Sequence, residues 1–225
     1  MLRIEDVYKT FNQGVENKVI NGVNVSINEK EFIVITGKSG SGKSTLLYLM
    51  SGLEKPTKGK ILFKGKDISG FDDNQLSSLR RKTFGFVFQF YNLVASLSAF
   101  DNIFLPITIE RKVNQEEKER VLDFAKEIGI YDKLSFYPHQ LSGGEQQRVA
   151  IVRALAINPE IIFADEPTGN LDSISREDVL KVFETLHKAY GKTIVMVTHD
   201  ESISSRFATK ELYLENGKII RETSV

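Results

Sequence analysis

The stretch "GKSGSGKST" at 37–45 has residue types suited to holding phosphate groups. It fits the pattern G-x-x-x-x-G-K-[ST], in which glycines let backbone N–H groups face phosphate oxygens and a lysine, here Lys43, reaches the terminal phosphates. The Ser44 hydroxyl can ligate Mg²⁺. A chance Gly/Ser-rich turn is the alternative, but an apolar run before the stretch and the helix-forming "TLLYLMSGL" after it favour a phosphate loop. The expected nucleotide contacts are Gly37, Lys38, Ser39, Gly40, Ser41, Gly42, Lys43, Ser44 and Thr45.

Acidic residues end a second apolar run, "EIIFADE" at 160–166. Asp165 is suited to hold the metal, directly or through water, and Glu166 can orient or deprotonate an attacking water. Adjacent acids at a strand end are often merely solvated, so this pair indicates a metal and water site only in combination with the phosphate loop.

Two more apolar runs end in polar residues that could serve the same ligand. "FGFVFQ" ends at Gln89, whose neutral oxygen could complete a Mg²⁺ shell or touch the water. "KTIVMVTHD" contains His199, which could donate a hydrogen bond to the γ-phosphate and take part in catalysis. Alone, either residue is more often a surface or structural one.

A second phosphate-binding pattern, "LSGGEQQ", occupies residues 141–147. Its serine and glycines precede a helix-forming run, so free backbone N–H groups would face an anion at the helix start. The segment has no lysine, and we expect it to lie remote from the strand ends of its own chain. In two copies packed head to tail, Ser142, Gly143 and Gly144 of each would cap the γ-phosphate bound by the other. A helix cap without a ligand is the alternative.

Four apolar runs predict the strands that must position these residues. Their low polarity on both faces, with helical stretches between them, indicates a parallel sheet covered on both sides, and ligands bind beyond the carboxyl ends of such strands. The runs are 32–37, 84–89, 160–166 and 192–200.

Other segments predict an antiparallel subdomain and a helical lobe. "LRIEDV" and "VINGVNVSI" are typical of half-buried antiparallel strands. "GKILFKG" at 59–65 and the segment 210–222 are typical of hairpin elements, the second with its turn at "ENG". We expect a single α/β domain, 1–225, of the P-loop NTPase (RecA-like) class. Its core and β subdomain comprise 1–89 and 160–225, and its inserted helical subdomain 90–159. One helix of the lobe should carry Val121, Leu122, Phe124, Ala125 and Ile128 along one side.

Composition limits the function classes. The chain has 30 Lys and Arg residues and 30 Asp and Glu residues, so its formal net charge is zero. The net charge therefore favours neither nucleic acid nor an anionic membrane as the main partner. The absence of cysteine excludes disulfides and cysteine-ligated zinc. No apolar run approaches the ~18 residues that cross a bilayer, so a membrane role would require another chain.

The order and spacing of the phosphate loop, Gln89, "LSGGEQQ", "IIFADEP", "GNLD" and His199 resemble the nucleotide-binding subunit of ATP-binding-cassette transporters over residues 2–222. The resemblance implies hydrolysis of Mg²⁺–ATP in a sandwich homodimer, with Asp172 of "GNLD" crossing the dimer interface. It also implies an aromatic residue stacked on adenine. Phe11 fits that position best, and Tyr8 is the alternative.

"FVFQFYNLVASLSAFDNI" and "ADEPTGNLD" are similar to the macrolide-export and lipoprotein-release group, close to peptide-antibiotic resistance transporters. This implies a separate multi-span membrane permease subunit and a place at the cytoplasmic face of the membrane. Because the chain stops at Val225, we expect that subunit to be separate, or this chain to be an excised domain. Phe90 or Tyr91 could contact the permease, or equally belong to the core. A soluble or regulatory cassette ATPase, of iron–sulfur assembly or cell-division type, is the alternative function.

Overall fold

A computed structural model describes residues 1–12, 14 and 16–224. The chain forms two compact units: unit 1 comprises residues 1–80 and 191–225, and unit 2 comprises residues 81–190. The predicted helical segment 90–159 is therefore part of a larger unit that also contains two strands.

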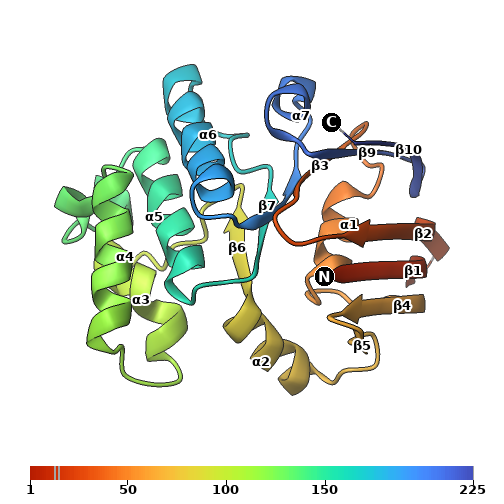
Figure 1. Ribbon diagram of the computed structural model, residues 1–225, viewed down its shortest axis with the longest axis horizontal. Helices are drawn as coiled ribbons and strands as arrows, with labels where there is room; N and C mark the ends of the chain where they lie inside the picture. Colours follow the sequence, from red (N-terminus) through yellow and green to blue (C-terminus); the bar gives the residue numbers. More distant parts are fainter. Residues whose placement is uncertain (13, 15, 225) are drawn as a thin grey trace. The chain divides into compact units, whose positions relative to one another are not determined.

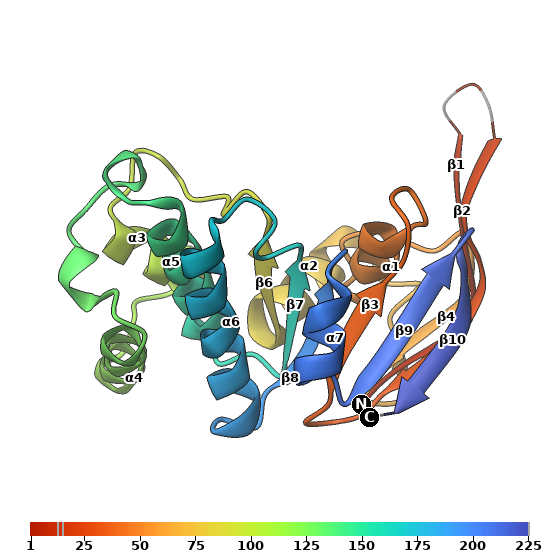
Figure 2. The ribbon, with the colours of Figure 1, turned by 90° about the horizontal axis from the view of Figure 1, so that it is seen from above.

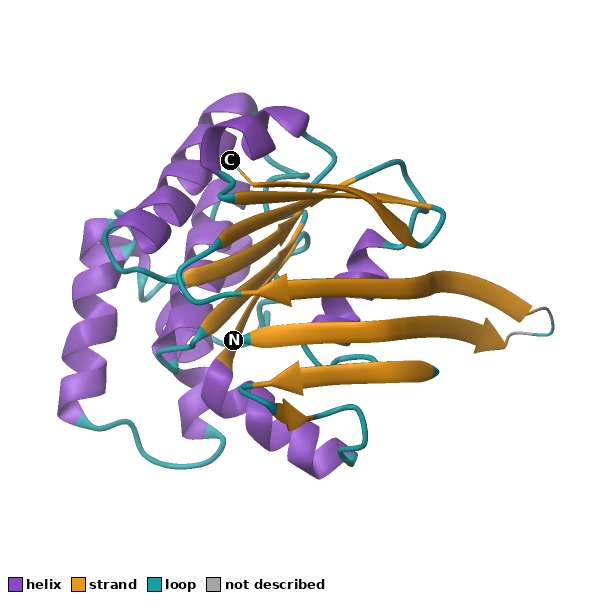
Figure 3. Cartoon of the chain, turned by 45° about the vertical axis from the view of Figure 1, so that its right-hand side comes forward, coloured by secondary structure: helices purple, strands orange, loops and turns teal. Residues whose placement is uncertain are grey.

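Unit 1 contains an antiparallel sheet in the order β2-β1-β4-β5, as predicted (Figures 1 and 3). Leu2, Ile4 and Val7 are almost fully buried, so one face of the first strand packs into the core. The strands are β1 (Leu2–Asn12), β2 (Glu16–Ile27), β4 (Lys58–Phe63) and β5 (Lys66–Asp67).

Unit 1 also contains four strands in the order β10-β9-β3-β8. They are β3 (Phe32–Thr36), β8 (Thr193–Val197), β9 (Lys210–Glu215) and β10 (Lys218–Ser224). β3 pairs in parallel with β8 and β9, and every residue of β3 and β8 is buried, as a sheet covered on both faces requires. The β9–β10 hairpin turns at Asn216 and Gly217, whose φ angles of 48° and 73° suit a tight hairpin, so the predicted turn is confirmed.

Helices α1 (Lys43–Met50) and α7 (Glu201–Phe207) cover this part of unit 1. α1 packs against β8 and α7 against β3, and the two helices lie on opposite sides of β3 (Figures 1 and 2). α2 (Asp73–Thr83) begins in unit 1 and ends beyond residue 80.

In unit 2, helix α5 (Gly143–Ala156) is the central element: it packs against β6, α3, α4 and α6 (Figure 1). β6 and β7 form a parallel pair. The remaining bounds are β6 (Phe84–Phe88), α3 (Ala99–Thr108), α4 (Gln115–Glu127), η1 (Tyr131–Lys133), η2 (Pro138–Gln140), β7 (Ile161–Asp165) and α6 (Ser173–Lys188).

The predicted helix of the lobe is confirmed as α4. Asn114 caps its start in a reciprocal capping box with Glu117, which satisfies two backbone donors. Three of the five residues predicted to share its apolar side are buried, whereas Leu122 and Ile128 are only half-buried.

Candidate nucleotide-binding site

The phosphate loop follows β3 directly and adopts a backbone that two of its glycines make possible. A Cβ atom at Gly37 would lie 2.1 Å from the Leu214 carbonyl oxygen, which no side chain tolerates. Gly42 has a φ of 101° and would place a Cβ 2.8 Å from the Val19 carbonyl oxygen. The loop therefore needs glycine at these positions because the neighbouring main chain leaves no room.

Lys43 begins α1 and turns its side chain into the loop. Its Nζ donates to the carbonyl oxygens of Gly37 (2.9 Å) and Lys38 (3.0 Å), and the side chain is buried. Gly42, the residue before α1, provides no side-chain cap among the described residues, and a helix start of this kind suits an anion. The buried Ser41 Oγ has no hydrogen-bond partner among the described residues. A phosphate oxygen would satisfy this hydroxyl.

His199 follows β8, the parallel neighbour of β3. Parallel strands end at the same edge of a sheet, so unit 1 brings His199 and the phosphate loop to one edge, as predicted. The segment after β8 is fixed on both sides: Asp200 N–H donates to Thr198 Oγ1 (3.1 Å), and Asp200 Oδ1 accepts from Ser202 N–H (2.9 Å).

In unit 2 the ends of β6 and β7 are similarly adjacent. Phe88 is paired with Asp165, so Gln89 and Glu166 each follow directly at the same sheet edge. Asp165 is buried, with 9% of its surface exposed. Glu166 has a φ of 46°, a left-handed conformation that is uncommon for a residue with a side chain and that clusters at functional sites.

Asn170, which the sequence did not predict as a site residue, holds Gln89 in unit 2. Its Nδ2 donates to the Gln89 carbonyl oxygen (3.2 Å), and Gln89 Nε2 lies 3.4 Å from Asn170 Oδ1. The signal that could have identified Asn170 is the "GNLD" motif, in which it precedes Asp172 by two positions.

The "LSGGEQQ" segment forms the start of α5. Ser142 Oγ accepts from Glu145 N–H (3.3 Å) and Glu145 Oε2 accepts from Ser142 N–H (2.8 Å), a reciprocal capping box. The hydrogen bond from the Ser142 backbone keeps the pKa of Glu145 below its usual value. Ser142 itself is exposed.

The expected remoteness of this segment from the strand ends of its own chain is wrong within unit 2. Gln147 Nε2 donates to the Pro167 carbonyl oxygen at 2.7 Å, directly after Glu166. A Cβ at Gly144 would lie 2.8 Å from Ser175 Cβ, so the segment also packs against the start of α6. The physical reason is that α5 packs along β6 and brings its own first turns to the ends of the strand pair.

Asp172 caps α6: its Oδ1 accepts from the N–H groups of Ile174 and Ser175, both at 3.0 Å. These hydrogen bonds lower the pKa of Asp172, because they favour its charged form. The cap is a role that sequence reasoning missed, and the expected place of Asp172 between two copies stays a prediction.

The two aromatic candidates near the N-terminus differ in their surroundings. The hydrogen bond from Tyr8 to Asp6 raises the pKa of Tyr8, and the hydroxyl lies against Gly22. Phe11 is half-buried with Lys9 Nζ 4.7 Å from its ring centroid. Of the other two aromatics, Phe90 is 71% exposed and Tyr91 half-buried.

These features define a P-loop ATPase. β3 runs into a glycine-rich loop, Lys43 and Ser44 lie at the start of the following helix, and β7 ends in an acidic residue. A protein-family model described as "ABC transporter" matches residues 20–169. The chain belongs to the ABC transporter family, as the ATP-binding subunit that hydrolyses ATP.

Relatives whose names state a function match nearly the whole chain. The lipoprotein-releasing system ATP-binding protein LolD of Aquifex aeolicus is 43% identical over 99% of this chain and 97% of its own length. The macrolide export ATP-binding/permease protein MacB of Hyphomonas neptunium is 42% identical over 99% of this chain, which spans 34% of that longer protein. A solved ATP-binding cassette from Methanocaldococcus jannaschii, described as dimeric in a post-hydrolysis state bound to ADP and Pi, has a TM-score of 0.90 and 40% identity, covering 100% and 98% of the two chains.

Proposed function

We propose that the chain binds and hydrolyses Mg²⁺–ATP through the residues described above. The phosphate loop and His199 of unit 1 bind the phosphates, and Gln89, Asp165 and Glu166 of unit 2 bind the metal and the attacking water. The observation that carries this is the buried Ser41 Oγ, which has no hydrogen-bond partner among the described residues and lies in the loop just before α1, a helix whose start has no side-chain cap. Phe11 is the proposed stacking partner of adenine.

The proposed metal ligands suit Mg²⁺. Ser44 supplies a hydroxyl, Gln89 an amide oxygen and Asp165 a carboxylate, all hard oxygen donors. Across the described residues no group of three or more His, Cys, Asp or Glu side chains is placed to hold a metal. Mg²⁺ commonly takes one or two protein carboxylates and completes its shell with phosphates and water. When bound, it would neutralise charge on the β- and γ-phosphates.

Hydrolysis would then proceed by in-line attack of water on the γ-phosphate. Glu166 orients or deprotonates that water. Lys43 and His199 stabilise the charge on the transferred group, so positioning and electrostatics supply most of the rate.

A second copy of the chain would complete each site. The exposed Ser142 begins α5, and the first turn of that helix presents N–H groups to which a γ-phosphate could bind. The dimeric relative bound to ADP and Pi supports this arrangement. ATP binding would then close the dimer, and hydrolysis would allow it to open.

The first test is Glu166→Gln. It should retain ATP binding and yield a stable ATP-bound dimer, while turnover falls by about 100-fold or more because the amide cannot accept a proton. Single-turnover hydrolysis and size-exclusion chromatography with ATP measure both effects. Glu160→Gln, before the opposite end of β7, is the matched control and should hydrolyse ATP normally. Normal turnover in Glu166→Gln would remove Glu166 as the base.

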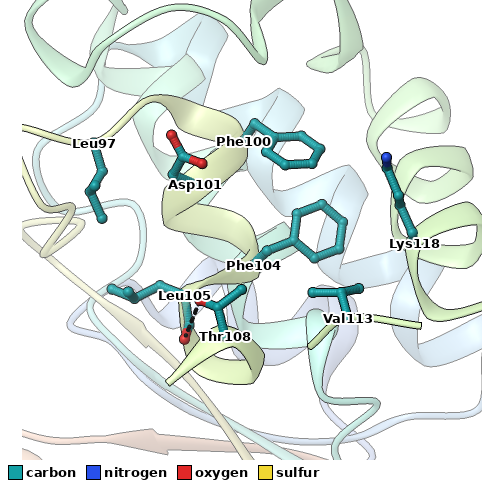
Figure 4. A pocket seen from close by; sticks show the side chains of 8 residues that line it. All are labelled: Leu97, Phe100, Asp101, Phe104, Leu105, Thr108, Val113 and Lys118. Carbon is teal, nitrogen blue, oxygen red and sulfur yellow. Dashed lines mark hydrogen bonds between the residues drawn. The ribbon is translucent and has the colours of Figure 1, made fainter. Parts of the chain in front are cut away.

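We further propose a separate membrane permease as partner, which would place the chain at the cytoplasmic face of the membrane. Among the described residues, no helix is long and apolar enough to span a bilayer. Unit 2 has a groove of about 470 Å³ between α3 and the start of α4, to which Phe100, Phe104 and Leu105 contribute (Figure 4). Apolar side chains dominate it and single charges stand at Asp101 and Lys118, as in a protein-docking site.

Leu105→Glu tests the groove as the permease contact. Leu105 is half-buried and lines the groove, so the carboxylate should weaken co-purification with the membrane subunit by about tenfold or more. Ile109→Glu is the matched control, since Ile109 is 68% exposed and does not line the groove. Basal ATPase activity of the purified chain should be unchanged in both. Equal co-purification of the two variants would contradict a docking role.

A further inference from the structure

Gln147 is buried completely, yet its side chain is polar. Its Nε2 donates to the Pro167 carbonyl oxygen at 2.7 Å and lies 3.4 Å from the Phe88 carbonyl oxygen. Its Oε1 is buried and has no hydrogen-bond partner among the described residues. An unpaired buried oxygen costs stability, and a methionine would fill similar space without it. Packing alone therefore does not explain a glutamine here.

The two carbonyl groups that Gln147 contacts belong to the residues adjacent to two proposed site residues. Phe88 directly precedes Gln89, and Pro167 directly follows Glu166. One buried amide thus spans the backbone ends of β6 and β7. Since Glu166 has a left-handed backbone, surrounding contacts must hold it there, and the bond to Pro167 is one of them.

The helix that carries Gln147 also holds the chain on the far side of Gln89. Arg153 donates to the carbonyl oxygens of Tyr91 (2.7 Å) and Asn92 (2.6 Å). Burial lowers the pKa of Arg153, and an arginine side chain keeps its charge in proteins. Side chains of α5 therefore contact the main chain on both sides of Gln89, and Ser142 caps the start of the same helix.

We propose that Gln147 is a positioning residue for ATP hydrolysis. It couples the place of α5, and hence of the "LSGGEQQ" segment at its start, to the orientation of Glu166 and Gln89. The proposal rests on the role proposed above for these two residues. A ligand that shifts the start of α5 would shift the backbone beside the catalytic carboxylate, because a rigid helix joins them.

The test is Gln147→Met in the full-length chain, with Gln146→Met as the matched neighbour. Gln146 donates to Leu141 within its own segment and contacts neither strand end by hydrogen bond. We expect kcat to fall about 10- to 100-fold in Gln147→Met, as for small misplacements of catalytic groups, while ATP affinity stays close to the parent. Gln146→Met should keep its kcat. An unchanged kcat in Gln147→Met, or an equal loss in both variants, would overturn the proposal.

The pH dependence of kcat in Gln147→Glu is a measurement that general destabilisation would not change. An ionised carboxylate cannot donate to the Pro167 carbonyl, but the protonated acid can, and burial favours the protonated form. Relative to the parent, kcat should therefore recover as pH falls from about 8.5 to about 6, whereas Gln147→Met should show no recovery. If the ratio of the Gln147→Glu kcat to the parent kcat does not change with pH, the donor role is contradicted. A wrong assignment of Glu166 can be distinguished from a wrong role for Gln147, because it would appear as normal turnover in Glu166→Gln.

Discussion

At the scale of single residues, Ser142 has two separable tasks. In the structure its hydroxyl caps α5 through Glu145, a contact within one chain. In the proposed function Ser142 and the N–H groups of the two glycines after it face the phosphate held by a second copy. The first task requires a side-chain acceptor, and the second requires that no negative charge stands beside the phosphate.

Ser142→Asp separates these tasks. Aspartate caps helices as well as serine does, so the melting temperature should stay close to the parent, whereas hydrolysis should fall by about 100-fold because the carboxylate repels the γ-phosphate. Thermal unfolding and ATPase assays on the same preparation measure both. Ser98→Ala is a control for loss of a cap alone, since Ser98 caps α3 in the same way. Parent-level ATPase activity in Ser142→Asp would show that the segment does not approach phosphate.

At the scale of elements, the contact between α5 and β6 determines how closely the helix approaches the strand pair. A Cβ atom at Gly85 on β6 would lie 2.8 Å from the Ala154 carbonyl oxygen on α5. The glycine therefore allows a helix backbone to lie directly against a strand backbone. This close approach is also what brings Gln147 within hydrogen-bond distance of the strand ends.

Gly85→Ala should push α5 away from β6. We expect a loss of about 1–3 kcal/mol in the free energy of unfolding, typical of overpacking, together with lower kcat. Denaturant unfolding and steady-state ATPase assays check both. Gly70→Ala is the control, because a Cβ there meets nothing within 4 Å. If both variants unfold at the same denaturant concentration as the parent, the helix does not depend on this close approach.

At the scale of the whole molecule, the proposed reaction needs groups from two copies of the chain. The phosphate loop supplies one side of the γ-phosphate, and the partner's α5 would supply the other. Neither copy would then hydrolyse ATP efficiently alone, and a change of affinity between open and closed dimers would be the source of work on a membrane subunit.

A forced heterodimer tests this arrangement. One chain carries Lys43→Ala and the other Ser142→Arg, so both defects should fall in the same composite site and leave the second site intact. We expect one ATP hydrolysed per dimer in a single turnover, against two in the parent, because each site combines one chain's loop with the other's α5. Placing both substitutions in the same chain is the control and should damage both sites. The opposite pattern would mean that each chain completes its own site.

The sequence by itself determined the main strands, the phosphate loop and the family, because these depend on local patterns: apolar runs, glycines next to a lysine, and short motifs in a fixed order. Only the tertiary structure decided three contacts: the hydrogen bonds between Asn170 and Gln89, the hydrogen bond from Gln147 to Pro167, and the close approach of α5 to β6 at Gly85. The Gln89–Asn170 and Gln147–Pro167 contacts join residues 81 and 20 positions apart. Such contacts depend on how helices pack on strands, and neither composition nor periodicity specifies which buried amide meets which carbonyl group.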